Sequence, residues 1–343
     1  MNQETRSWLE ASLDILCCPR CQADLALAGE ELRCGDCGQA FGLADNIPQL
    51  FWPNEWDESR KDVTEEIRAF YEETPFPNYD EFDSVGSMVQ KARRGMFAKM
   101  LDDQVPPGTK VLECGCGTGQ LSNFLSISNR TVFGTDICVN SLRLGQQFKE
   151  QNGLENVRFV QQNLFRPVFA PETFDLVISN GVLHHTSDPK RAFLSISRLV
   201  KPGGYIIIGL YHRYGRLTTD FRRFFFNLSG NRLTGLDPNL RAGRFQAAKW
   251  RAWFMDQYKH PHESKHTVGE TLGWLREAGF SFVKSIPRTK LFQPITEKDR
   301  LFQPEAPGGW PERTLAELAM IRGGSREGGF FTVIGRKPAA SAT

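Results

Sequence analysis

The chain has 343 residues, of which 40% are hydrophobic and 24% charged, and its formal net charge is +2. This composition is ordinary for a globular protein and excludes a wholly disordered chain. Because no apolar run reaches the roughly 20 residues of a membrane span, and the first residues lack the order of a signal peptide, we expect a cytoplasmic protein. The balanced charge gives no global reason to expect nucleic acid or anionic membrane as a partner.

Residues 1–52 hold a cysteine cluster. Cys18 and Cys21 form one C-x2-C pair, and Cys34 and Cys37 form a second. This spacing can supply four thiolates to a tetrahedral zinc ion, and in a reducing cytosol it indicates metal rather than disulfides. The alternative is a degenerate ribbon with metal-free thiols. Four thiolates leave no open coordination position, so we expect a structural zinc.

Short strands are expected at residues 25–27 and 31–33, with a turn at Gly29 between them. This arrangement resembles small zinc-ribbon-like domains. Cys17 is expected to be a spare small residue rather than a fifth ligand.

Residues 53–107 are acidic, with 13 Asp and Glu against seven Lys and Arg. They contain an aromatic-proline segment at 75–79 and then a helical pattern through Met88, Phe97 and Leu101. We expect an acidic linker and cap helices here.

From residue 108 to 210, short apolar runs alternate with amphipathic ones, which predicts a parallel sheet with crossover helices. The alternation resumes after residue 267 with a helix at about 268–278 and continues into the C-terminal part, 267–343. The expected strands are Lys110–Glu113, Thr131–Thr135, Val157–Val160, Phe174–Ser179, Tyr205–Leu210, Phe280–Ile286 and Phe330–Gly335.

A glycine-rich loop follows the first of these strands. It begins at Glu113 and places glycines at 115, 117 and 119, where the backbone can turn tightly and approach a ligand. Asp136 ends the next strand about 20 residues further on, where an acidic side chain can accept hydrogen bonds from ribose hydroxyls. Together these features predict a nucleotide-type cofactor site.

The loop, the strand ending at Asp136, the segment Phe174–His185 and the turn Lys201–Gly204 resemble the successive motifs of class I S-adenosylmethionine-dependent methyltransferases. The resemblance implies an α/β Rossmann-like sheet that is parallel except for its last strand. It also implies S-adenosylmethionine as cofactor, with Glu113 near the methionine amino group and Asp136 on the ribose. The cofactor-binding residues that it implies are Glu113, Gly115, Cys116, Gly117, Gly119, Asp136, Asn163, Leu164 and Asn180.

One departure from the family pattern is Asn163, which stands where the family usually has Asp against the adenine amino group. An amide oxygen can still accept that bond. The alternative cofactor is NAD, but dinucleotide folds prefer G-x-G-x-x-G to the G-x-G-x-G found here.

Candidate catalytic residues are His184, His185 and His212, which lie at or just past the ends of expected strands. Each could act as a general base, and each could equally be packed in a loop with its ring bonded to the backbone. His260, His262 and His266 could form a second metal site, but the sequence offers no obvious fourth ligand.

Residues 211–266 interrupt the alternation with 11 Lys and Arg, four Asp and Glu, and 11 aromatic residues. We expect this insertion to fold over the cofactor pocket as a lid. Its content suits an acidic or aromatic acceptor, an RNA or a lipid surface. The alternative is a helical cap whose aromatics pack inward, namely Phe224, Phe225, Phe226, Trp250 and Trp253.

Three functions are compatible with these features. The first is a methyltransferase for a small molecule or biosynthetic intermediate. The second is a ribosomal RNA methyltransferase, because an N-terminal zinc ribbon joined to this fold resembles certain ribosomal RNA guanine methyltransferases. The basic insertion supports this function. The third is a cofactor-binding protein without catalysis, which the intact glycine loop disfavours. The acceptor, the methylated atom and the oligomeric state stay open.

Overall fold

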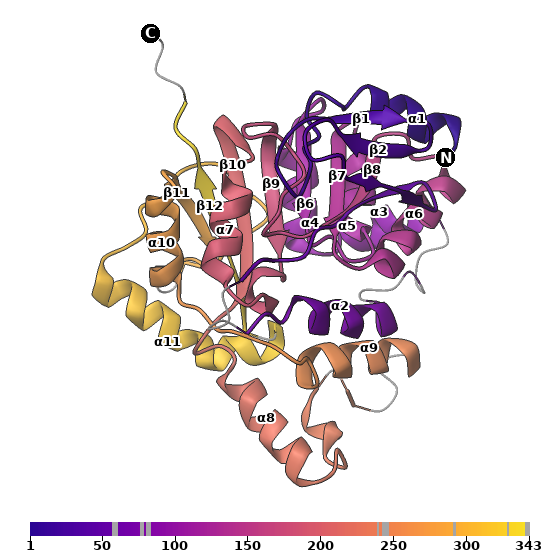
Figure 1. The fold of residues 1–343 in the computed structure, drawn as a ribbon. Coiled ribbons are helices and arrows are strands. Elements are labelled where there is room, and N and C mark those ends of the chain that lie inside the picture. Colours follow the sequence, from indigo (N-terminus) through magenta and orange to yellow (C-terminus); the bar gives the residue numbers. More distant parts are fainter. Residues whose placement is uncertain are drawn as a thin grey trace.

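The computed structural model describes residues 1–56, 61–75, 79, 84–238, 240–241, 247–290, 293–327 and 329–339. A nine-stranded sheet runs through the molecule in the order β11-β12-β10-β9-β6-β7-β8-β5-β4 (Figure 1). Its strands are β11 (Ser281–Ile286), β12 (Phe330–Arg336), β10 (Val200–Tyr211), β9 (Phe174–Asn180), β6 (Lys110–Cys114), β7 (Thr131–Asp136), β8 (Val157–Gln162), β5 (Ile47–Leu50) and β4 (Leu43–Ala44).

The sheet confirms the predicted Rossmann-like fold. Strands β10, β9, β6, β7 and β8 pair in parallel, and β12 is antiparallel to both β10 and β11. Every expected strand is present, and β10 begins earlier than expected. Its first residue, Val200, pairs with Phe174 ahead of an irregularity that spans Pro202, Gly203 and Gly204. Proline and glycine at this point hid the start of the strand in the sequence.

Two helical layers cover the sheet and bury a separate apolar cluster on each face. One layer holds α7 (Pro189–Ser197) and α10 (Val268–Glu277), and the other holds α3 to α6. The helices of the second layer are α3 (Val85–Ala92), α4 (Met96–Gln104), α5 (Gln120–Ser126) and α6 (Val139–Asn152). No helix in the described part of the chain is long and apolar enough to cross a membrane.

The N-terminal segment is built into the large sheet. Helix α1 (Gln3–Glu10) leads to a three-stranded sheet of β1 (Leu25–Ala28), β2 (Glu31–Cys34) and β3 (Ala40–Phe41), which confirms the short strands expected there. The hairpin β4–β5 then joins the edge of the large sheet, where β5 pairs in parallel with β8. The expected limit of this module at residue 52 therefore does not separate two independent cores.

Residues 53–107, expected as an acidic linker and cap helices, form three helices in their described part. Helix α2 (Thr64–Glu73) lies below the sheet in Figure 1, next to α9 (Ala247–Tyr258) of the insertion. Residues 76–78 of the expected aromatic-proline segment lie outside the described residues.

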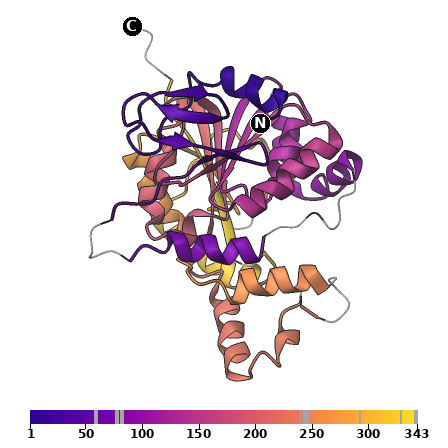
Figure 2. The ribbon, with the colours of Figure 1, turned by 45° about the vertical axis from the view of Figure 1, so that its right-hand side comes forward.

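The insertion forms α8 (Leu217–Leu228), the short 3-10 helix η2 (Thr234–Leu236) and α9, and it protrudes from one end of the molecule (Figure 2). Its own apolar cluster joins Phe226 of α8 to Phe254 and Tyr258 of α9. The expectation that its aromatics pack inward is correct for Phe226 but wrong for Phe224, which is 62% exposed. Helix α11 (Trp310–Glu327) contacts α8 from the C-terminal part.

Candidate functional site

A cavity of about 650 Å³ lies at the carboxyl ends of β6, β7 and β9. Open α/β sheets bind ligands at this edge. The glycine loop forms its floor, and α2 and α9 contribute walls that lie far from the loop in the sequence. The insertion thus reaches the cavity, as expected of a lid. The volume of the cavity lies within the range of small-molecule sites.

The three glycines of the loop have backbone φ angles of 74°, 54° and 72°, which favour glycine. Gly115 and Gly117 line the cavity together with Cys116. Gly119 does not line the cavity. A Cβ at this position would lie 2.4 Å from the ring of Phe159. Gly119 therefore allows α5 to approach the sheet closely.

Asp136 lines the cavity at the end of β7. Its carboxylate accepts hydrogen bonds from the backbone N–H groups of Gly117 at 2.8 Å and Cys138 at 2.9 Å. The same carboxylate that faces the cavity thus fixes the glycine loop relative to the start of α6.

Glu113 is buried at the end of β6, where its carboxylate accepts a hydrogen bond from the Ser122 hydroxyl. Burial and, to a smaller extent, the nearby Asp136 raise the pKa of the Glu113 carboxyl to about 8, against the lowering effect of the hydrogen bonds from Ser122. No cationic side chain is among the causes of this shift. A carboxyl in such a place is suited to a ligand that brings a positive charge.

Asn163, Leu164 and Asn180 also line the cavity, as expected. The amide nitrogen of Asn163 donates to the backbone oxygen of Trp52 and to Asn54, while its oxygen accepts from the Phe165 N–H. The segment after β5 therefore orients this amide. The side-chain oxygen of Asn180 is buried and has no hydrogen-bond partner in the described part of the chain.

Helix α2 is tied to the cofactor end of the cavity through Glu72. Its carboxylate accepts hydrogen bonds from the backbone N–H groups of Val139 at 3.0 Å and Asn140 at 3.3 Å. A carboxylate at a helix N-terminus satisfies unpaired N–H groups and complements the helix dipole. This contact could not be predicted from a local pattern, because Glu72 and α6 are distant in the chain.

At the other end, polar side chains from three separate segments meet around one wall. The Tyr71 hydroxyl of α2 donates to Asp256 at 3.2 Å, and the Gln257 amide donates both to Asp256 and to the Tyr211 hydroxyl at 2.8 Å. All four residues line the cavity. Sequence reasoning missed Tyr71, Asp256 and Gln257, since only the fold brings α2 and α9 to the end of β10.

His185 lines the cavity beside this group, from the 3-10 helix η1 (Leu183–His185). Its Nδ1 lies 2.9 Å from the backbone oxygen of His262. Since a carbonyl only accepts, Nδ1 carries the proton and Nε2 keeps its lone pair. Burial lowers the pKa of His185 to about 4, so the ring is neutral at pH 7.

His184 and His212 lie outside the lining of the cavity. His184 is fully buried and stacks on Tyr211 with ring centroids 4.0 Å apart. His212 is also fully buried, with Nε2 3.7 Å from a Glu317 oxygen. The structure therefore brings one of the three candidate histidines to the cavity. His184 precedes His185 in the same 3-10 helix and His212 directly follows β10, so their positions in the sequence alone could not separate them from His185.

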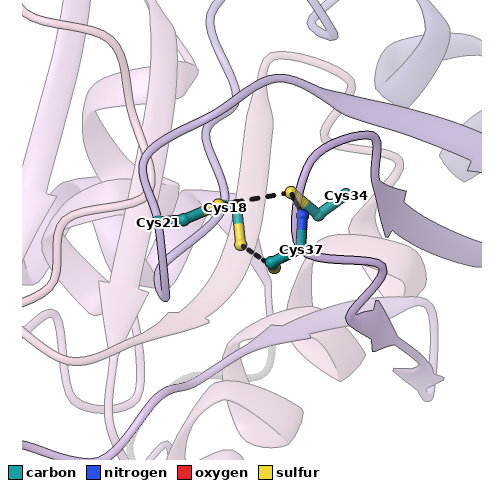
Figure 3. Close-up of side chains that lie close together, drawn as sticks. All are labelled: Cys18, Cys21, Cys34 and Cys37. Carbon is teal, nitrogen blue, oxygen red and sulfur yellow. Dashed lines mark hydrogen bonds between the residues drawn. The ribbon is translucent and has the colours of Figure 1, made fainter.

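The cysteine cluster lies away from the cavity, in the loops that flank β1 and β2 (Figure 3). The four sulfurs lie within 4.8 Å of one another, with Cys18 and Cys37 3.7 Å apart and Cys21 and Cys34 3.4 Å apart. Zinc–sulfur bonds of about 2.3 Å in a tetrahedron separate the sulfurs by about 3.8 Å. Among the described residues, no other cluster of three or more potential ligands occurs, so His260, His262 and His266 do not form one.

Residues 106–251 match the protein family described as "Methyltransferase domain". An uncharacterized protein of Synechococcus sp. is 27% identical over 217 residues, which cover 56% of this chain and 51% of that protein. The ubiquinone biosynthesis O-methyltransferase of Paracidovorax citrulli is 30% identical over 107 residues, 31% of this chain and 45% of the relative. The demethylmenaquinone methyltransferase of Bacillus cytotoxicus is 31% identical over 135 residues, which cover 37% of this chain and 56% of the relative.

The chain spans about half the length of these curated relatives. The matched segment contains the glycine loop, Asp136, the strand before His185 and most of the insertion. The sheet order, the loop geometry and this match agree with one another. Over residues 106–251 the chain is therefore similar to the methyltransferase domain family.

Proposed function

We propose that the protein methylates a small-molecule acceptor that loses a proton in the reaction, and that His185 receives this proton. The observation that carries the proposal is the neutral imidazole of His185, which lines the same cavity as the glycine loop. The named activities of the two matched methyltransferases are in accord with an acceptor of this size.

The cofactor end of the cavity fits S-adenosylmethionine in charge and shape. Glu113 offers a carboxyl without a cationic partner to an amino group, Asp136 offers carboxylate oxygens to ribose hydroxyls, and the glycines allow close backbone approach. When bound, the cofactor supplies an electrophilic methyl carbon on a sulfonium. The protein has to align the acceptor with that carbon, and positioning of this kind contributes about 7–11 kcal/mol.

His185 can take the acceptor's proton at Nε2. The hydrogen bond from Nδ1–H to the His262 carbonyl fixes the tautomer and favours the imidazolium when the proton arrives. Tyr71, Tyr211 and Gln257 form the adjoining wall and are bonded to one another through Asp256 or directly. We infer that this wall orients the acceptor. Because α2 and α9 both line the cavity and its volume is about 650 Å³, the cavity favours a small molecule over a structured RNA.

The test is His185→Gln, measured as transfer of labelled methyl groups to a panel of phenolic and quinol acceptors. We expect kcat to fall about 10²–10⁴-fold, as for loss of a general base. The affinity for S-adenosylmethionine, measured by calorimetry, should stay unchanged. For the wild type, kcat/KM should fall on the acid side only near pH 4, since protonation of the free imidazole occurs there. Unchanged kcat in a folded variant would remove His185 from the reaction.

The four cysteines fit a structural zinc ion, and we include this ion in the proposal. The Cys37 N–H lies 3.5 Å from the Cys34 sulfur, as expected where backbone amides stabilise thiolates. A four-thiolate site leaves no position for a substrate, so the zinc would stabilise the N-terminal fold. A cytoplasmic location is part of the same proposal, because thiolates persist in a reducing compartment.

A further inference from the structure

Helix α8 presents a row of large apolar side chains to solvent. Leu217, Phe221, Phe224 and Leu228 are 48%, 64%, 62% and 73% exposed. They are spaced by four, three and four residues, which places them on one face of the helix. We call these four residues the α8 face. Leu233 and Leu236, just after the helix, are 45% and 49% exposed.

The opposite side of α8 is occupied by the core of the insertion. Phe226 is fully buried against Phe254 and Tyr258 of α9, with ring centroids 6.3 and 4.7 Å away. The insertion therefore has its own core, and the α8 face is not needed for it. Contiguous exposed apolar side chains of this kind mark an interaction surface.

The charged side chains of the insertion are predominantly basic, with 11 Lys and Arg against four Asp and Glu in residues 211–266. The four acidic residues of segment 211–266 are all engaged: Asp220 with Lys265, Asp237 with Tyr258, Asp256 with Tyr71 and Gln257, and Glu263 with Arg216 and Arg223. In contrast, the side chains of Arg232, Arg241 and Arg251 are exposed and have no ion pair within the described ranges. The outer surface of the insertion therefore combines apolar side chains with unpaired positive charge.

We propose that the α8 face and these arginines dock on the surface of an anionic phospholipid bilayer. A helix with an apolar face and flanking basic residues lies in the plane of the interface, with its apolar side chains among the acyl chains. Each arginine near an anionic surface adds about a fivefold increase in affinity. The positive charge of the exposed arginines complements the negative charge of the phospholipid headgroups, and this favours a bilayer as the partner.

Two other occupants fit less well. A second copy of the chain would bring arginines of the same sign together, which disfavours association. RNA would use the arginines, but the aliphatic side chains Leu217 and Leu228 offer no ring on which bases can stack. An anionic lipid surface can contact both the apolar side chains of the α8 face and the exposed arginines.

The position of the face adds a geometric consequence. Helix α9 lines the cavity with Trp253, Asp256 and Gln257, and α8 packs against the same helix through Phe226. Docking would therefore place the bilayer next to the helix that forms the acceptor wall. The docking proposal itself does not depend on the identity of the acceptor.

The experiment is sedimentation of the full-length protein with phosphatidylcholine vesicles, with and without phosphatidylglycerol. We expect binding that requires the anionic lipid. Phe221→Ser with Phe224→Ser should lower the partition coefficient at least tenfold. Arg232→Gln, Arg241→Gln and Arg251→Gln together should lower it by about fivefold for each arginine and weaken its dependence on phosphatidylglycerol.

The matched control is Met96→Ser on α4, which removes an exposed apolar side chain, 36% exposed, away from the insertion. It should leave vesicle binding unchanged, and unchanged thermal unfolding of all variants shows that the fold is intact. Equal binding by wild type and the phenylalanine variant would overturn the proposal. So would a wild-type dimer that the phenylalanine variant dissociates, or salt-dependent binding of structured ribosomal RNA that only the arginine variant loses.

Discussion

At the scale of single residues, the cavity depends on two carboxyl groups with different partners. Asp136 accepts two backbone hydrogen bonds that order the glycine loop, whereas Glu113 is bonded to Ser122 and has the Asp136 carboxyl as a nearby charged group. The two are next to each other in the fold but contribute to binding in separate ways. One can therefore be changed while the other serves as reference.

We expect Asp136→Ala to weaken S-adenosylmethionine binding by about 1.5–3 kcal/mol, because hydrogen bonds to a charged acceptor are lost. Isothermal calorimetry on the folded variant measures this directly. Asp136→Asn, which keeps an acceptor for the loop amides, should lose less. Unchanged affinity in the alanine variant would place Asp136 outside the cofactor site.

We expect the Glu113 carboxyl to release a proton when the cofactor binds. Its pKa of about 8 keeps the carboxyl protonated in the free protein at pH 7. An ammonium group beside it favours the ionised form, so binding at pH 7 should release a proton. Calorimetry in buffers of different ionisation enthalpy counts this proton. The count should fall in Glu113→Gln, and an equal count in both proteins would contradict the assignment.

These residues also show what the sequence could predict about the site. Glu113, Asp136 and Asn180 line the cavity, and each lies at or next to the end of a strand that the local pattern reveals. Tyr71 and Asp256 could not be placed, because their roles depend on the packing of α2 and α9, which no local period encodes. Polar contacts between distant segments are specified only by the complete fold.

At the scale of elements, the Glu72 carboxylate of α2 caps the start of α6 and is one of the contacts that hold α2 beside the cavity. We expect Glu72→Ala to remove this cap, which costs about 0.5–2 kcal/mol of stability at comparable helix caps. Because α2 lines the cavity with Val63, Thr64 and Ile67 near its start, its release should also speed cofactor dissociation.

Stopped-flow dissociation and thermal unfolding measure these two effects of Glu72→Ala. Glu66→Ala on the same helix is the matched control, since Glu66 pairs only with the exposed Lys61 among the residues described. If the cofactor dissociates from both variants at the wild-type rate, the contact between Glu72 and α6 does not control release of the cofactor. The sequence could not indicate this role, because the stretch TEEIRAFYEE reads as an ordinary polar helix.

At the scale of the whole molecule, the N-terminal segment and the methyltransferase sheet share one core. Leu16, Leu32 and Leu50 belong to the same apolar cluster as Phe133 and Phe174 of the central strands. The backbone N–H of Cys17 also donates to the oxygen of Val168 at 2.8 Å. Loss of order in the first segment should therefore be felt throughout the sheet.

We expect freshly reduced protein to hold about one zinc ion per chain, and Cys34→Ser to lower this content. Removal of the ion by a chelator should lower the Tm of the entire chain in one cooperative transition, because the core is continuous. Calorimetric scans and metal analysis test both statements. Two separate transitions would show that the first 52 residues unfold on their own.

The overall architecture was the most predictable part of the molecule. Alternating apolar runs and the glycine loop specify a parallel sheet, since they encode period and turn chemistry locally. The pairing of β5 with β8 was not predictable, because Ile47-Pro48-Gln49-Leu50 is short, contains a proline and gives no periodic signal. An edge strand of this kind is recognised only next to its neighbour.

The pairing of β5 with β8 also constrains how the protein is made. A ribosome delivers Leu50 about 110 residues before its partner Gln162, and contacts between such distant positions form slowly. During that interval the cysteine knuckles can already capture metal, since all four lie before β5 in the chain. The nascent N-terminus would thus wait as a metal-loaded fragment with an unpaired strand. Its exposed edge makes this interval the point in biosynthesis at which aggregation or a chaperone would act.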